Sequence, residues 1–173
     1  MKRASGARPA VNPEFLSGEA SASPAVEPML AGARRLAEAG HGAGLLSARN
    51  GLRTTTHANV PFGSLAAGDF VEVADYDPHL DRLLVIGKRE PHSFAGMHAL
   101  MLRAKREVGA IAMAEGKPRE GIRAVSRGRT MLESALAALE GLRGRDAVAM
   151  APYVLAVGRT PEEALARLEA SLA

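Results

Sequence analysis

Apolar side chains recur at helical spacing in four stretches of the chain, where they fall three or four positions apart and so share one face of a helix. Start and stop signals flank these stretches: Pro28 suits a first helical turn, Gly40 suits a helix end, and Thr130 with Glu133 forms a capping box. For the helix after Thr130, the spacing predicts a buried side made of Leu132, Ala135, Leu136 and Leu139. The predicted helices span residues 28–40, 93–106, 130–141 and 160–172.

Shorter stretches between the helices have the patterns of β-strands. Asn50 and Gly51, the strongest short-range signal for a β-hairpin, separate the sequences LLSAR and LRTTT. From Asp69, apolar residues alternate with polar ones, whereas Gly109 to Ala114 is too short and too apolar for a surface helix and predicts a buried strand. The strands are expected at 45–49, 52–56, 69–77, 82–88, 109–114, 147–150 and 153–158.

The order of these elements predicts the fold class. A helix, a run of antiparallel strands, and then helices alternating with strands make a layered α/β or α+β domain. With 173 residues, the chain is long enough for one such domain over residues 27–173 and too short for two. Residues 1–26 are rich in Pro, Ser, Gly and Ala, so we expect a flexible N-terminal arm that docks at most through Phe15 and Leu16.

Composition narrows the chemistry. The chain has no cysteine, so disulfides, thiolate nucleophiles and cysteine metal sites are excluded, and His and carboxylates remain as the strong metal ligands. A formal net charge of +3 favours anionic ligands only weakly. No stretch approaches the roughly 18 apolar residues of a membrane span, and no apolar signal core follows the basic start, so we expect a cytoplasmic protein.

The segment from Lys117 to Arg129 carries five basic residues against one acid and is expected to be a loop with a short helical piece. Such a segment could attract a phosphorylated or nucleic-acid partner. It has no interleaved aromatic side chains for base stacking, however, so a solvated basic loop is favoured and nucleic acid is not expected as a partner.

Four short motifs occur in a characteristic order. Gly44–Arg49 is followed by a Thr-containing loop at Thr56–Asn59, a polar loop before a helix at Pro91–Phe94, and the sequence VGRTPEEA at Val157–Ala164. In this order the chain resembles the class II aldolase/adducin family from about Pro28 to the C-terminus. The resemblance implies a class II aldolase-like three-layer domain, with a central, mostly antiparallel sheet flanked by helices.

The family's site residues are largely replaced. In the family, three His ligands hold a catalytic zinc, and a nearby Glu takes and returns a proton beside the substrate carbonyl. By the resemblance, the ligand positions carry Met113, Glu115 and Pro152 here, and the position of the catalytic Glu carries Phe94. We therefore expect no metal site and no cofactor.

A rebuilt site remains conceivable. His57 and His92 fall on the two loops that line the family's pocket, and with Glu115 they are the candidate catalytic residues. The structural interpretation of the histidines is favoured: His98 is expected to be a packed or capping residue on a helix, His41 and His79 to be turn residues, and His92 to be solvated. The candidate ligand-binding residues are Arg49, Asn59 and Ser93.

Two of the candidate ligand-binding residues also have a purely structural interpretation. Asn59 stands where the family has Gly, and Asn is the best substitute for Gly if the backbone there is left-handed. Ser93 is explained by capping the helix that follows.

Two classes of function stay open. The chain is either a scaffold that has lost zinc chemistry and serves as a small-ligand binding or assembly domain, or an enzyme with a rebuilt site that need not use a metal. In the second case, aldehyde-lyase or isomerase-like chemistry on a small sugar-phosphate or carbonyl substrate is expected. The partners expected are a small anionic or carbonyl ligand and further copies of the chain, with a tetramer favoured by the resemblance.

Overall fold

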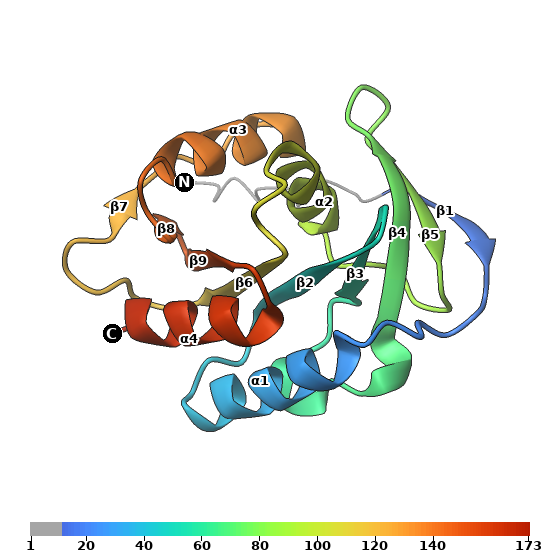
Figure 1. The fold of residues 1–173 in the computed structure, drawn as a ribbon, viewed down its shortest axis with the longest axis horizontal. Coiled ribbons are helices and arrows are strands. Elements are labelled where there is room, and N and C mark those ends of the chain that lie inside the picture. Colours follow the sequence, from blue (N-terminus) through green and yellow to red (C-terminus); the bar gives the residue numbers. More distant parts are fainter. Residues whose placement is uncertain (1–11) are drawn as a thin grey trace, which may run out of the picture.

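A nine-stranded sheet, with helices on both faces, organises residues 12–173, the part of the chain that the computed structural model describes (Figure 1). The strands are β1 (Asn12–Ser17), β2 (Gly44–Asn50), β3 (Arg53–His57), β4 (Phe70–Asp77), β5 (Arg82–Ile86), β6 (Ala110–Glu115), β7 (Arg123–Ala124), β8 (Ala147–Met150) and β9 (Tyr153–Gly158). The helices are α1 (Val26–Glu38), α2 (Ala95–Ala104), α3 (Met131–Gly141) and α4 (Pro161–Ser171). No helix in this part of the chain combines the length and the apolar character that crossing a bilayer requires.

The strand order is β1-β5-β4-β3-β2-β6-β9-β8-β7. Six of the eight neighbouring pairs are antiparallel, and the two parallel pairs, β1 with β5 and β7 with β8, lie at the two edges. The expected central, mostly antiparallel sheet is therefore confirmed.

Strand β6 shows how the sheet separates two cores, because successive side chains of a strand point to opposite faces. Ile111 and Met113 pack in the cluster that includes α2 and α3, whereas Ala110, Ala112 and Ala114 pack in the cluster that includes α1 and α4. In Figure 1, α2 and α3 lie above the sheet and α1 and α4 lie below it. The predicted three-layer arrangement is confirmed, and small alanines let α4 approach the sheet closely.

The local signals that predicted the turns and caps are also borne out. Asn50 lies opposite Arg53 across the β2–β3 turn, and Gly51 has the positive φ, 61°, that such a turn requires. At the start of α3, Thr130 Oγ1 accepts a hydrogen bond from the Glu133 amide at 3.1 Å, and the Glu133 carboxylate accepts one from the Thr130 amide at 3.4 Å. These contacts satisfy amide groups that no helical carbonyl can reach.

The buried side of α3 is only partly the one that we predicted. Leu136 is 58% exposed, and the buried residues are Met131, Ser134, Ala135, Ala138 and Gly141. The helix turns a stripe of small side chains inward because space is short there: a Cβ on Gly141 would lie 2.5 Å from a methyl group of Val125. Close packing therefore outweighs the burial of the larger leucine.

The prediction for residues 117–129 was also wrong in part. The segment contains no helical piece, and it contributes strand β7 to the edge of the sheet instead.

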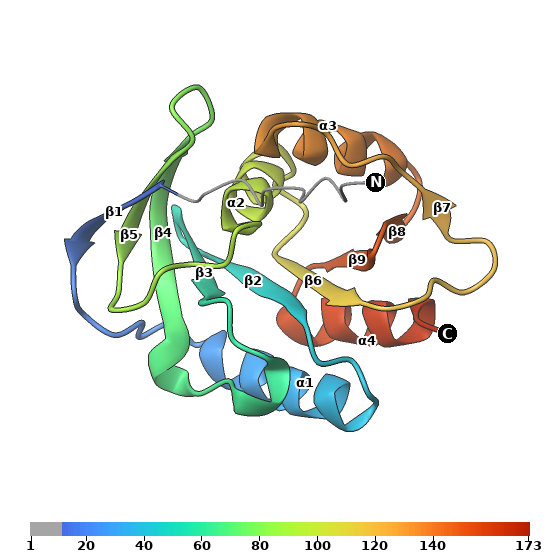
Figure 2. The ribbon, with the colours of Figure 1, turned by 180° about the vertical axis from the view of Figure 1, so that it is seen from behind.

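The N-terminal arm needs a correction as well. Residues 12–17 form β1, which runs parallel to β5 along the sheet edge, as Figures 1 and 2 show, although Phe15 is still 47% exposed. Backbone pairing with the open edge of β5 offsets the cost of ordering a stretch that buries little apolar surface. Further along, the Ser21 hydroxyl donates to the buried carboxylate of Glu72, which holds the connection to α1 against the sheet. The expected flexibility of residues 1–11 lies outside the described residues.

Candidate functional site

The loop that leads into α2 lies against the end of β3. The His92 amide donates to the His57 carbonyl at 3.0 Å, and Pro91 forms an isolated bridge with Ala58. The structure thus brings together the two histidines that the sequence singled out. Their side chains have different surroundings, and these decide what each can do.

His57 is fully buried and has both ring nitrogens occupied. The Leu46 amide donates to Nε2 at 3.0 Å, so Nδ1 carries the proton and donates to the Ala58 carbonyl at 2.7 Å. Burial lowers the pKa of His57 to about 4, although the bond to Ala58 acts in the opposite direction. His57 therefore ties β2 to the loop after β3 as a neutral ring, and the interpretation of this residue as structural is the one that the geometry supports.

His98, on α2, lies in the same buried region. Its Nδ1 is 2.8 Å from Ser47 Oγ, which is 2.9 Å from Thr56 Oγ1, and Thr56 donates to the Leu46 carbonyl at 3.3 Å. Burial, with His92 and His57 nearby, lowers the pKa of His98 to about 3. We expected a packed histidine at this position, and the structure confirms it.

Phe94 fills the centre of the region where we looked for a site. Its side chain is only 3% exposed, the His92 ring stacks on it at 5.8 Å between centroids, and the Tyr153 ring meets it edge-on at 5.4 Å. The guanidinium carbon of Arg127 lies 4.7 Å from the ring centroid, in cation–π contact. The sequence did not reveal Tyr153 or Arg127 as neighbours, because both come from distant segments. We call Phe94, His92, Tyr153 and Arg127 the aromatic plug.

The start of α2 differs from the one that the sequence predicted. Phe94, not Ser93, occupies the N-cap position, and no side chain caps the helix. The Phe94 amide donates to Nδ1 of His92 at 3.2 Å instead. The prediction that Ser93 caps this helix is therefore wrong. The N-cap position lies one residue later, and the Ala95 amide, which a cap at Ser93 would serve, donates to the His92 carbonyl at 2.9 Å.

The three positions that the resemblance assigns to zinc ligands do not fit a zinc ion. Met113 is 1% exposed within the apolar core, and Pro152 has no donor atom in its side chain. Glu115 has the one suitable ligand group of the three, an exposed carboxylate at the end of β6, and zinc sites need three or four N, O or S ligands. Within residues 12–173, no group of three or more His, Asp or Glu side chains is placed to hold a metal.

Arg49 does not join the other candidate residues. Its guanidinium donates to the carbonyl oxygens of Leu102, Lys105 at 3.0 Å and Val108 at 2.9 Å, so it closes the C-terminal end of α2. The Arg49 amide pairs with Gly109 just before β6 begins, whereas Glu115 ends that strand. At about 3.3 Å per residue, the stretch from Gly109 to Glu115 spans roughly 20 Å, so Arg49 and Glu115 lie roughly that far apart.

Asn59 is exposed, in the loop that follows β3. Asp81 is the one non-glycine residue with a positive φ within residues 12–173, so the left-handed backbone that we considered for Asn59 does not occur. A left-handed backbone therefore does not explain the Asn at this position.

Glu115 presents an exposed carboxylate at the end of β6, where the strand pairs with Tyr153 of the aromatic plug. His41 lies close to Glu115, but the His41 Nδ1 donates to the main-chain carbonyl of that residue at 3.2 Å and not to the carboxylate. Among the described residues, no hydrogen bond or ion pair joins the Glu115 carboxylate to a second group as a proton-transfer pair would require.

No protein-family model matches the chain, and no curated protein matches it by sequence. Solved structures do match its fold. An L-fuculose 1-phosphate aldolase shares 19% identity over 87% of this chain and 82% of its own, with a TM-score of 0.71. The L-fuculose-1-phosphate aldolase of Thermus thermophilus shares 18% identity over 84% of this chain and 85% of its own, with a TM-score of 0.62. YgbL from Klebsiella pneumoniae shares 19% identity over 84% of each chain, with a TM-score of 0.66.

Proposed function

We propose that this chain, which has the class II aldolase-like fold, is a small-ligand binding or assembly domain that does not use the zinc chemistry of aldolases. Two kinds of observation support the proposal. The fold likeness supplies the scaffold, and the replaced ligand positions Met113 and Pro152 remove the means of holding zinc.

The burial of Phe94 carries the proposal. The resemblance places the proton-shuttling carboxylate of the family at this position. Here the ring is 3% exposed and packed between His92 and Tyr153, with Arg127 against its face. A carbonyl substrate could not reach this point without displacing the ring, and a metal-stabilised enediolate would have no base there.

Metal loading together with an activity assay tests the proposal. Protein as purified is compared with protein that has been incubated with excess zinc and freed of loose metal by gel filtration. Both samples are assayed for bound metal and for cleavage of L-fuculose 1-phosphate. The expected result is far less than one zinc per chain and no cleavage above background. Stoichiometric metal, or cleavage in either sample, would overturn the proposal.

An enzyme with a rebuilt site is the second candidate, and the exposure of Glu115 favours it. This carboxylate lies at the end of β6, where the main chain pairs with Tyr153 of the aromatic plug. In this case Glu115 would act as base on a small sugar-phosphate or carbonyl substrate beside His92, without His57. Turnover that Glu115→Gln abolishes and Glu14→Gln, an exposed control, leaves intact would select this candidate.

We also propose that the chain forms a homo-oligomer, most simply a tetramer. The proposal rests on the resemblance, because the family assembles rings of four with sites between neighbours. Glu115 and Pro152 are exposed in the single chain, as residues at such a junction would be. Sedimentation should give a mass several times 18.1 kDa, and a mass near that of one chain would refute the proposal.

A further inference from the structure

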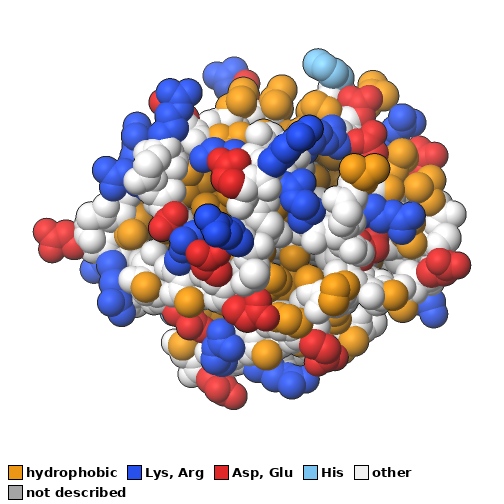
Figure 3. Space-filling model, viewed as in Figure 1, with side chains coloured by type: hydrophobic (Ala, Val, Ile, Leu, Met, Phe, Trp, Pro, Cys, Tyr) orange, Lys and Arg blue, Asp and Glu red, His pale blue; other side chains and the backbone are white. Residues whose placement is uncertain are grey.

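A concave region lies at the other end of α2, away from the aromatic plug. It is a depression of about 340 Å³ between the β2–β3 hairpin, β4 and the C-terminal half of α2, and we call it the arginine depression. On the face shown in Figure 3, Lys and Arg side chains gather over α2. The charged residues that line the depression are Arg49, Arg53, Arg103, Arg106 and Asp75.

The arginine depression has an excess of positive charge that its own groups do not neutralise. Four arginines against one carboxylate leave three positive charges, as many as the formal net charge of the entire chain, +3. Arg103 is paired with Asp75. Arg53 and Arg106 have no carboxylate within ion-pair distance in the described part of the chain. The cationic charge is therefore available to a ligand.

The excess of positive charge is larger here than in the neighbouring depression, where Lys105, Arg145, Arg159 and Arg167 face Glu107, Asp146 and Glu163. This neighbouring depression has a volume of about 220 Å³. There Arg167 lies 2.7 Å from a Glu163 oxygen and 3.4 Å from an Asp146 oxygen, so its charge is neutralised within the depression. The arginine depression differs because its one carboxylate serves a single arginine.

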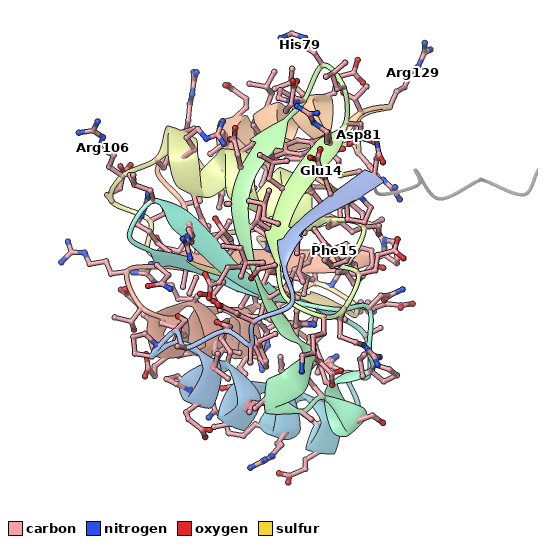
Figure 4. The ribbon with its side chains drawn as sticks, turned by 90° about the vertical axis from the view of Figure 1, so that its right-hand side faces the viewer. Glu14, Phe15, His79, Asp81, Arg106 and Arg129 are labelled. Atoms are coloured by element: carbon pink, nitrogen blue, oxygen red, sulfur yellow. The ribbon has the colours of Figure 1, made fainter. Side chains whose placement is uncertain are left out.

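One wall of the arginine depression is held rigidly. The three carbonyl groups at the end of α2 fix the guanidinium of Arg49, so its charge stays in place without a ligand. Arg53 comes from the start of β3, and Arg106 comes from the turn after α2, from which it projects in Figure 4. Arg53, Arg106 and the anchored Arg49 therefore line the same space of small-molecule size.

We propose that the arginine depression binds a small phosphorylated anion. Guanidinium groups donate two parallel hydrogen bonds to phosphate oxygens, and a ligand with two phosphate groups would engage Arg53 and Arg106 together. The volume suits a small molecule. This site is separate from the region around Phe94, so it stands whether or not the proposed function holds.

Calorimetric titration with inorganic pyrophosphate at near-physiological salt tests the assignment. The wild-type chain is compared with Arg53→Gln, Arg106→Gln and the double variant. The control is Arg129→Gln, which removes one positive charge from an exposed side chain that also has no ion pair within residues 12–173 and projects from the other side of the molecule (Figure 4). Since charge-assisted contacts are lost, each single variant should weaken binding about fivefold and the double variant at least about tenfold, whereas the control should stay within about twofold.

Two results would overturn the assignment. One is the absence of binding to the wild-type chain at millimolar pyrophosphate, and the other is an equal loss of affinity in Arg106→Gln and in the Arg129→Gln control. The second result would mean that net charge alone attracts the anion. Unchanged urea midpoints of unfolding in all variants would show that a loss of binding does not come from a loss of fold.

Discussion

The two ends of α2 have opposite characters. At the N-terminal end, Phe94 is packed among aromatic rings, and the buried His57 and His98 are held neutral by their surroundings. At the C-terminal end, Arg53 and Arg106 line an open depression without carboxylate partners in the described part of the chain. One end is closed by packed rings and its buried histidines are neutral, whereas the other is open and has an excess of positive charge.

The comparison teaches where this chain has capacity for a ligand. At the closed end, both ring nitrogens of His57 are already hydrogen-bonded to the backbone. A ligand could bind His57 only by breaking hydrogen bonds that stabilise the fold. At the open end, the charges of Arg53 and Arg106 contribute little to the fold and can be offered to a ligand. Changes at the closed end should therefore alter stability, and most changes at the open end should alter binding alone.

Acid should have the largest effect, and it should act on the closed end. The folded pKa values of His57 and His98, about 4 and about 3, lie below the ordinary value of 6.5, so the unfolded chain binds more protons between these values. Stability is therefore full above about pH 6.5 and falls as the pH is lowered toward 4. The free energy of unfolding should fall by ~1.4 kcal/mol per pH unit for each histidine, as measured by urea unfolding from pH 7 to pH 4.5.

A pair of variants isolates that contribution. His98→Gln should remove about one proton from the difference in bound protons between the unfolded and folded chain, so the free energy of unfolding should change less steeply with pH. This holds whatever the variant does to the stability at pH 7. His79→Gln is the control, because His79 is exposed at the tip of the β4–β5 turn (Figure 4). A free energy of unfolding that does not change between pH 6.5 and 5 would show that His57 and His98 are accessible to water in the folded chain.

Removing the central ring of the aromatic plug should have the next largest effect. Phe94→Ala deletes the contacts to His92 and Tyr153 and leaves a cavity, so the free energy of unfolding should drop by ~3 kcal/mol in chemical denaturation. Leu136→Ala, at a 58% exposed position on α3, should cost less than ~0.5 kcal/mol. A loss below ~1 kcal/mol for Phe94→Ala would mean that the ring is not tightly packed.

At the open end, Arg49 should be the exception that contributes to stability. Arg49→Met keeps the aliphatic stem but leaves the carbonyls of Leu102, Lys105 and Val108 without this donor, which should cost ~1–2 kcal/mol in urea unfolding. Arg53→Met is the matched variant from the same depression and should stay within ~0.5 kcal/mol. Equal losses in the two variants would contradict the distinction between a structural and an available arginine.

The smallest effect on stability is expected from Asp75→Asn. The ion pair between Asp75 and Arg103 is more than half exposed on both sides, so breaking it should change the free energy of unfolding by no more than ~0.5 kcal/mol. Pyrophosphate binding should instead become a few-fold tighter by calorimetry, because the one carboxylate of the arginine depression is gone. Weaker binding would show that Asp75 positions Arg103 for the ligand.

The order of the elements could be predicted from the sequence because the signals are local. The Asn50-Gly51 turn, the Thr130 capping box and the alternation in β4 each depend on a few neighbouring residues, and all of them form as expected. Strand β1 escaped prediction because its stabilising partner, β5, lies far along the chain. The sequence also could not show which face α3 buries, since neighbouring segments decide this.

The candidate site, too, could be predicted from the sequence only in part. The sequence brought attention to His57 and His92, and the structure does place them side by side. It could not show that His57 has both nitrogens engaged, that Arg49 serves the end of α2, or that Tyr153 and Arg127 pack on Phe94. These facts depend on which distant backbone groups and side chains reach each residue.

By itself, the sequence determined the helices, most of the strands, their layered arrangement and the likeness to class II aldolases. The elements follow from periodicity and capping, which act over short stretches of chain, and the likeness follows from the order of the motifs along it. Only the tertiary structure decided which polar side chains are engaged in the fold and which are available. Strand register and helix packing bring together residues as distant as Arg53 and Arg106, and a depression with unneutralised charge exists only once they meet.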